Sequence, residues 1–187
     1  MGDASVRAAI VSYFNTTTNL AASNIEKWYQ DEPWFLQGQD WNLRANGGWG
    51  CIGYVHLDTA SETRRAFGGV DLTGAPQGSK MILHTVSLVG MYQFLIPTNK
   101  TNVTDAADRW VGPLDAMIDA TKNAIRIDPT LGTAAQGNAR AIWQAGQGYN
   151  GAPDIRQTRD LPVQDPQRGR VISWWRLEFD ALEIIQG

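Results

Sequence analysis

A single cysteine, Cys51, occurs among the 187 residues of the chain. One thiol excludes an internal disulfide, and it excludes the zinc and redox motifs that need two cysteines close in sequence. Histidine is limited to His56 and His84. The HExxH, GxSxG and GxxxxGKS/T signatures are absent. The sequence therefore carries no motif typical of a metalloprotease, an α/β-hydrolase or a P-loop nucleotidase.

Neither sign of charge is in excess, because 16 Lys and Arg residues stand against 19 Asp and Glu residues, for a net charge of −3. No block of like charge occurs, so nucleic-acid binding by phosphate neutralisation is not expected. The most apolar stretch, 81–97, is interrupted by His84 and Gln93 and falls short of the roughly 18 apolar residues of a membrane span. We expect no membrane contact, and the acidic start at Asp3 predicts no secretion signal.

Tryptophan and glycine are abundant, with 8 and 19 residues. With glycine counted, about half of the chain is apolar, close to the usual globular share of roughly 45–50%. A sizeable core is therefore expected and general disorder is excluded. Trp28, Trp110 and Trp175 fall in periodic segments and are predicted core residues.

Two helices are predicted. Apolar residues at helical spacing run from Val6 to Phe14, and this helix is expected to end in the run Asn15–Thr18. The second pattern starts at Thr104 and continues to Ile125, and Pro113 within it either kinks the helix or marks its start. The sequence DPTLG at 128–132 is expected to end it, and 61–67 is expected to be a turn or a short helix.

Five strands are predicted, and two of them are unusually long. Short strands are expected at 25–30, 51–57 and 141–145, and long alternating patterns cover 79–96 and 170–186. At about 3.3 Å per residue the first long strand would reach nearly 60 Å, whereas a compact domain of this size has a diameter of about 40 Å. Either Gly90 marks a bulge or bend, or the strand projects beyond the globule.

These elements predict one α+β domain over residues 1–187. The expected architecture is an antiparallel β-sheet with long strands, flanked on one face by two α-helices. Long loops are expected at about 34–50 and 146–170, where glycine and proline gather.

The histidine, aspartate and glycine patterns of the sequence predict no active site. His56 and Asp58 point to one side of a strand, but two ligands do not make a metal site. Asp115 and Asp119 share a helix face with basic residues after them, as the helix dipole favours on a solvated surface. The GxGxxG match at 146–151 is followed by prolines rather than by a helix, so it predicts a loop. We expect no catalytic residue, cofactor or metal, and no enzyme activity.

The aromatic residues outside the periodic patterns are the candidate site. Trp34, Phe35 and Trp49 lie in the predicted loop, and Trp174 points away from the side that Trp175 buries. Such residues are enriched where a surface is buried against a partner protein. A local cluster under the loop and a platform for a sugar are the alternatives.

Several segments, taken in order, carry a family resemblance. They are KWYQDEPWF at 27–35, GSK at 78–80, KNAIRIDPTLG at 122–132, IWQAGQG at 142–148, and SWW at 173–175 ahead of FDALE at 179–183. With the opening amphipathic helix, they make the chain resemble tail terminator (tail-completion) proteins of long-tailed, siphovirus-type bacteriophages, of the type found in phages of actinobacteria.

The resemblance implies an antiparallel sheet flanked by helices, and a homo-hexameric ring at the head-proximal end of the tail tube. Such a ring stops tube polymerisation and offers a surface to the head-completion or stopper protein of the neck. Its partners would be its own copies, the major tail tube protein and that neck protein, with DNA only passing through the lumen. The implied location is the virion tail at the neck junction, after assembly in the host bacterial cytoplasm.

Two alternatives stay open. One is another ring of the neck, and the other is a glycan-binding module or glycosidase that uses Trp34, Trp49 and the helix carboxylates. For the ring, we expect the contacts between copies at the far ends of strands 79–96 and 170–186, together with the loop that carries Trp34, Phe35 and Trp49. Uncovered strands expose unpaired backbone groups that invite pairing with another chain.

Overall fold

The computed structural model describes residues 3–33, 48–64, 69–70, 76–77, 79–96, 103–128, 130–132, 141–143, 155–167 and 169–186. Three helices occur in this part of the chain: α1 (Asp3–Phe14), α2 (Thr17–Ser23) and α3 (Val103–Ile127). The strands are β1 (Lys27–Tyr29), β2 (Trp49–Arg64), β3 (Gly69–Val70), β4 (Pro76–Gln77), β5 (Ser79–Leu95), β6 (Ala141–Trp143), β7 (Arg156–Arg159), β8 (Val163–Asp165) and β9 (Arg170–Gln186).

Seven strands form one sheet in the order β1-β2-β5-β9-β6, and β7 and β8 also pair with β9. The three long strands are antiparallel, and β5 pairs with β9 along its whole length, from Ser79 opposite Gln186 to Leu95 opposite Arg170. The short β1 is parallel to β2, so the sheet is mixed rather than purely antiparallel. The predicted α+β fold with long strands is confirmed.

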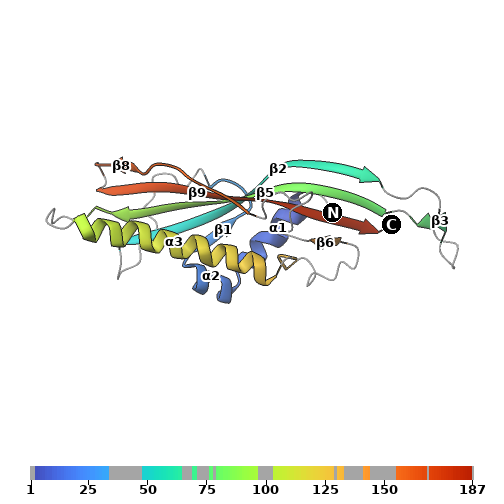
Figure 1. Ribbon diagram of the computed structural model, residues 1–187, viewed down its shortest axis with the longest axis horizontal. Helices are drawn as coiled ribbons and strands as arrows, with labels where there is room; N and C mark the ends of the chain where they lie inside the picture. The colour runs from blue at the N-terminus through green and yellow to red at the C-terminus, as the bar shows by residue number, and fades with distance from the viewer. Residues whose placement is uncertain are drawn as a thin grey trace.

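The helices lie on one side of this sheet (Figure 1). Their apolar faces and the facing side of the sheet form one buried cluster, to which α1 contributes Phe14 and α3 contributes Leu114. Trp28 and Trp175 are among its largest fully buried side chains, and Trp110 packs against it partly buried. The prediction that Trp28 and Trp175 belong to the core is confirmed, whereas Trp110 lies at the margin of the core.

A row of four residues crosses the middle of the sheet, one each from β1, β2, β5 and β9. The register places Trp28 beside Gly53, Gly53 opposite Gly90, and Gly90 opposite Trp175. A Cβ on Gly53 would lie 2.5 Å from the Trp28 ring, and one on Gly90 would lie 2.1 Å from the Trp175 ring. Each glycine thus leaves the space in which a tryptophan lies flat on the sheet, and the two rings meet edge to face, 6.3 Å apart.

Gly90 marks no bulge, because its pairing with both neighbouring strands is continuous. The register of β2 shifts instead between Leu57 and Thr59. Of the two alternatives for the long strand, projection is the one observed. In Figure 1 the ends of β2, β5 and β9 extend past the helices, and β3 lies beyond the ends of β2 and β5.

Some predicted boundaries were wrong. The predicted turn or helix at 61–67 is wrong for Ser61–Arg64, which continue β2. Helix α2 was missed, and α3 begins at Val103, so Pro113 lies inside the helix and not at its start. The expected stop after α3 is present, since the Asp128 side chain accepts hydrogen bonds from the backbone N–H groups of Thr130 and Gly132.

The two predicted loops are shorter than expected where they are described. Trp49 begins strand β2 instead of lying in a loop, and residues 34–47 lie outside the described residues. Within 146–170, strands β7 and β8 pair with β9. β7 is exposed and polar, and β8 is mostly exposed, so both are held by the ladder to β9 and not by a buried apolar face of their own.

Candidate interaction surface

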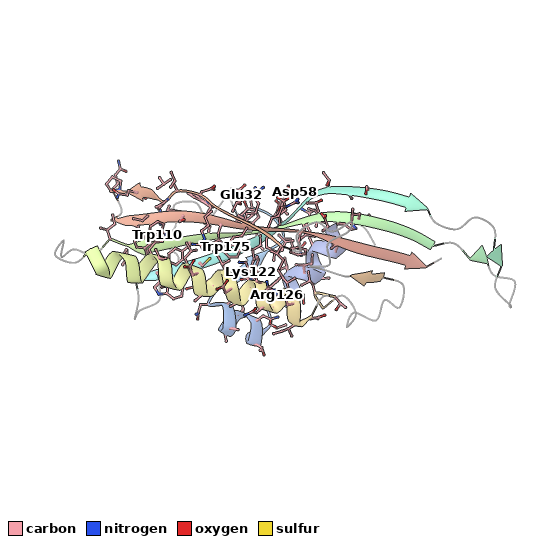
Figure 2. The ribbon with its side chains drawn as sticks, viewed as in Figure 1. Glu32, Asp58, Trp110, Lys122, Arg126 and Trp175 are labelled. Atoms are coloured by element: carbon pink, nitrogen blue, oxygen red, sulfur yellow. The ribbon has the colours of Figure 1, made fainter. Side chains whose placement is uncertain are left out.

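The side of the sheet opposite the helices carries the candidate site. Successive residues of a strand point to opposite faces, so the strands that bury Val55, Leu88 and Trp175 against the helices present their neighbours on the other face. Figure 2 shows Glu32 and Asp58 on this second side, with Lys122 and Arg126 of α3 on the helix side.

Two adjoining hollows lie on the second face and share Tyr54, Val89 and Arg176. The larger has a volume of about 420 Å³ and the smaller about 250 Å³. We call the two together the Tyr54–Arg176 trough. Its larger end is completed by Thr158, Asp160, Trp174 and Trp175, and its smaller end by Asp31, Glu32, His56 and Asp58.

The strand register brings the trough residues together from distant segments. Tyr54 on β2 lies opposite Val89 on β5, and Val89 lies opposite Arg176 on β9. Thr158 on β7 lies opposite Arg176 from the other side. The backbone N–H of Asp160 donates to the Trp174 carbonyl at 3.0 Å, which holds the end of β7 against β9. The trough is therefore built on four paired strands.

Carboxylates dominate the electrostatics of the trough. Burial raises the pKa of the Tyr54 phenol above its usual value, Glu32 raises it further, and Arg176 lowers it. Asp58 accepts a hydrogen bond from the Ser87 hydroxyl and lies 3.4 Å from Nε2 of His56. Asp31 and Asp58 raise the pKa of the Tyr54 phenol as well, so three carboxylates and the Arg176 guanidinium act on this side chain.

The structure separates the predicted site residues. Trp174 is half-buried and lines the trough, on the face opposite Trp175, as the alternation predicted. Trp49 lies on the helix side, where its ring packs against Tyr92 with centroids 5.8 Å apart. Trp34 and Phe35 lie outside the described residues. Trp49 and Trp174 therefore cannot belong to one patch, and Trp49 is part of the core margin.

The helix carboxylates contact cations. Asp115 pairs with Arg159 of β7, and Asp119 lies 3.6 Å from Lys122. These contacts lie on the helix side of the sheet, away from the trough. Among the described residues no group of three or more His, Cys, Asp and Glu residues could hold a metal ion.

Sequence analysis missed Tyr54, Arg176, Thr158 and Asp160. The alternation of β2 and β9 does place Tyr54 and Arg176 on the face opposite Val55 and Leu177. It cannot show that the two residues approach each other, because that depends on the register of both strands against β5. Thr158 and Asp160 gave no signal, because Thr158 lies in β7, a strand too short and too polar for a pattern, and Asp160 directly follows it.

A second candidate feature is the outer edge of β2. β1 pairs only with Ile52–Tyr54, and within the described ranges no strand pairs with the outer edge of residues 55–64. The side chains of Thr59, Ala60 and Ser61 on this stretch are exposed. Unpaired N–H and C=O groups on an exposed strand can accept a strand of another chain.

The opposite end of the sheet carries exposed apolar side chains. Leu161 is 87% exposed and Val163 is 55% exposed, and Val163 pairs with Ile172 near the beginning of β9. A buried Arg170 anchors this end, since its guanidinium lies 3.1 Å from Asp165 and donates to Gln93 at 2.9 Å.

None of the described helices is both long and apolar enough to cross a membrane. No protein-family model matches the chain, and no curated protein matches it.

Proposed function

We propose that this protein is a structural virion protein, a tail terminator that forms a homo-hexameric ring on the head-proximal end of a phage tail tube. The ring stops tube polymerisation and offers its other face to the head-completion or stopper protein of the neck. DNA passes through the lumen without sequence-specific contact.

The observation that carries the proposal is the open edge of β2 on a sheet that extends past its own helices. Among the described strands none pairs with the outer edge of residues 55–64, and an unpaired strand edge is a surface for pairing with another copy. The contact would join two different surfaces, and a heterologous contact that closes after six copies gives a ring.

The mechanism is geometric. One face of the ring reproduces the contacts by which tube subunits stack, and the other face does not, so no further tube subunit can add. This function needs no catalytic group, and the sequence resemblance to tail terminators supports it.

Ala60→Lys tests the edge. A lysine on an edge strand hinders pairing with another strand, and Ala60 is exposed, so the variant should fold and lose the ring. Ala22→Lys, the same change on the exposed surface of α2, is the control and should keep the ring. Native mass spectrometry gives the subunit count, and circular dichroism verifies the fold.

The results of these experiments test the contact at the edge of β2 and the proposed function separately. If Ala60→Lys assembles like the wild type, the edge of β2 is not the contact. If the wild-type protein is a strict monomer that never decorates tube ends in electron micrographs, the proposed function is wrong. Deleting the gene distinguishes the other neck rings: tails of uncontrolled length indicate a terminator, whereas normal free tails beside filled heads indicate a head-completion or stopper protein.

A further inference from the structure

The Tyr54–Arg176 trough has a short side chain at its centre and long side chains around it. Tyr54, Val89 and Arg176 lie side by side on β2, β5 and β9, and neighbouring strands of a sheet are about 4.8 Å apart. Because Val89 is small, the space above it stays open and forms the part that the two hollows share. Thr158 and Trp174 complete the larger end. The trough thus combines an apolar floor with aromatic, hydroxyl and charged walls.

Two groups of opposite charge line the larger end of the trough. They are the Arg176 guanidinium and the Asp160 carboxylate. Within the described ranges neither group is in an ion pair or a side-chain hydrogen bond, whereas the arginines of β7, Arg156 and Arg159, both pair with carboxylates. A guanidinium only donates hydrogen bonds and a carboxylate only accepts them. Both groups therefore keep this capacity for a bound molecule.

The mixture of charges favours a neutral ligand. An anion would meet the carboxylates of Asp160 and, at the smaller end, of Asp58, and a cation would meet the Arg176 guanidinium. A hydroxyl group both donates and accepts a hydrogen bond. Neighbouring hydroxyls of one molecule can therefore accept from Arg176 and donate to Asp160, and hydrogen bonds to charged groups are stronger than those between neutral groups.

The aromatic rings of the trough favour a ligand that also has a flat apolar face. Tyr54 on β2 and Trp174 on β9 lie on either side of β5, so the trough has a ring at two of its sides. The face of an aromatic ring packs against apolar groups. A sugar ring carries C–H groups on its face and hydroxyl groups around its edge, and it therefore matches both kinds of wall.

We propose that the Tyr54–Arg176 trough binds a neutral oligosaccharide. The volume of its larger end, about 420 Å³, is within the range of about 300–1,000 Å³ typical of small-molecule sites. The smaller end adjoins it and adds about 250 Å³, so a chain of more than one sugar unit can extend from Trp174 towards His56. This site is not the sugar platform considered at Trp34 and Trp49, and sugar binding goes beyond the proposed ring.

Other ligand classes fit the trough less well. An extended peptide binds a sheet by pairing with an open strand edge. The trough lies on the face of the sheet, where β5 and β9 are each paired with a strand on both sides. A nucleic acid brings phosphate groups, which the Asp58 and Asp160 carboxylates repel.

Calorimetric titration tests the inference with neutral hexasaccharides of glucose, galactose, mannose and N-acetylglucosamine. At least one of them should bind with a Kd of about 1 mM or lower. Trp174→Ala removes an aromatic wall, and Arg176→Met removes the guanidinium but keeps a long side chain, so each should weaken binding about tenfold or more. Arg126→Met is the matched control, because Arg126 is an exposed arginine on the helix side (Figure 2), and it should bind as the wild type does.

Three results would overturn the inference: a wild-type protein that binds none of the hexasaccharides, an Arg176→Met protein that binds them as well as the wild type, or tighter binding of heparin than of every neutral sugar. If Trp174→Ala unfolds by circular dichroism, Asp160→Asn, a change at an exposed residue, tests the same wall and should also weaken binding. Ring formation is measured separately without sugar. Intact rings without sugar binding contradict this inference alone.

Discussion

Gly90→Ala adds one methyl group at the centre of the sheet. The added Cβ would lie 2.1 Å from Cε2 of Trp175 and 2.4 Å from its Nε1. Trp175 is 1% exposed, and the Trp28 ring meets its edge. The ring cannot move away without displacing the core, so the change is an overpacking substitution.

Two opposing effects set its magnitude. In an unobstructed strand, alanine is more stable than glycine by about 0.5–1 kcal/mol. Overpacking a close-packed core costs about 1–3 kcal/mol, and a contact as short as this one is at the upper end. The net loss in free energy of unfolding should be about 2 kcal/mol, which lowers Tm by about 4–8 °C for a chain of this length.

Urea unfolding and calorimetry measure this loss, and the matched control is Gly112→Ala. Gly112 lies inside α3 with no atom within 4 Å of an added Cβ, so its replacement should stabilise the protein by up to about 1 kcal/mol. Adding Trp175→Leu should reduce the cost of Gly90→Ala, because the methyl group then has space. A Gly90→Ala protein as stable as the wild type would refute the reasoning.

Two further predictions concern buried polar groups. Burial raises the pKa of the Cys51 thiol and of the Tyr92 phenol above their values in the unfolded chain. The contribution of both groups to the free energy of unfolding is therefore complete below pH about 8.5 and is lost as the pH rises further. Urea unfolding should give a lower free energy at pH 10 than at pH 8, and equal free energies at the two pH values would contradict this prediction. Arg170→Met leaves the Asp165 carboxylate and the Gln93 side chain without the buried guanidinium. The free energy of unfolding measured in urea should fall by about 3 kcal/mol. An unchanged urea midpoint would show that Arg170 does not stabilise the protein.

The long strands at 79–96 and 170–186 were predictable because their sequences alternate over most of their length. In β9 burial follows this alternation, since Trp175, Leu177 and Phe179 are buried and the residues between them are less so. The outer half of β2 was not predictable from the sequence. Its residues Ser61–Arg64 are polar, and they are held in the strand by the ladder to β5. A polar strand held by a neighbour has no pattern of its own, and β7 and β8 were missed for the same reason.

Helix α2 shows a different limit. Its sequence, TTNLAAS, has no apolar periodicity, and its ends are fixed by local caps. The Thr16 side chain accepts a hydrogen bond from the Asn19 N–H, and the Asn24 N–H donates to the Leu20 carbonyl with Asn24 left-handed. Thr16 and Asn24 are residue types that favour such caps, so a search for caps as well as periodicity would have found the helix.

The candidate site was only partly predictable, because it depends on how the strands pair with one another. The alternation places Trp174 on the uncovered face, but the trough depends on which residues of three strands lie opposite one another. The acids of the trough come from three separate places: a turn after β1, a bulged position of β2 and the end of β7. Because these segments share no sequence pattern, the acids could not be grouped into one site from the sequence.

The core and the trough are two sides of the same strands. Val89, on the floor of the trough, precedes Gly90, and Arg176, in its wall, follows Trp175. A backbone shift that accommodates a methyl group on Gly90 must therefore move the trough as well.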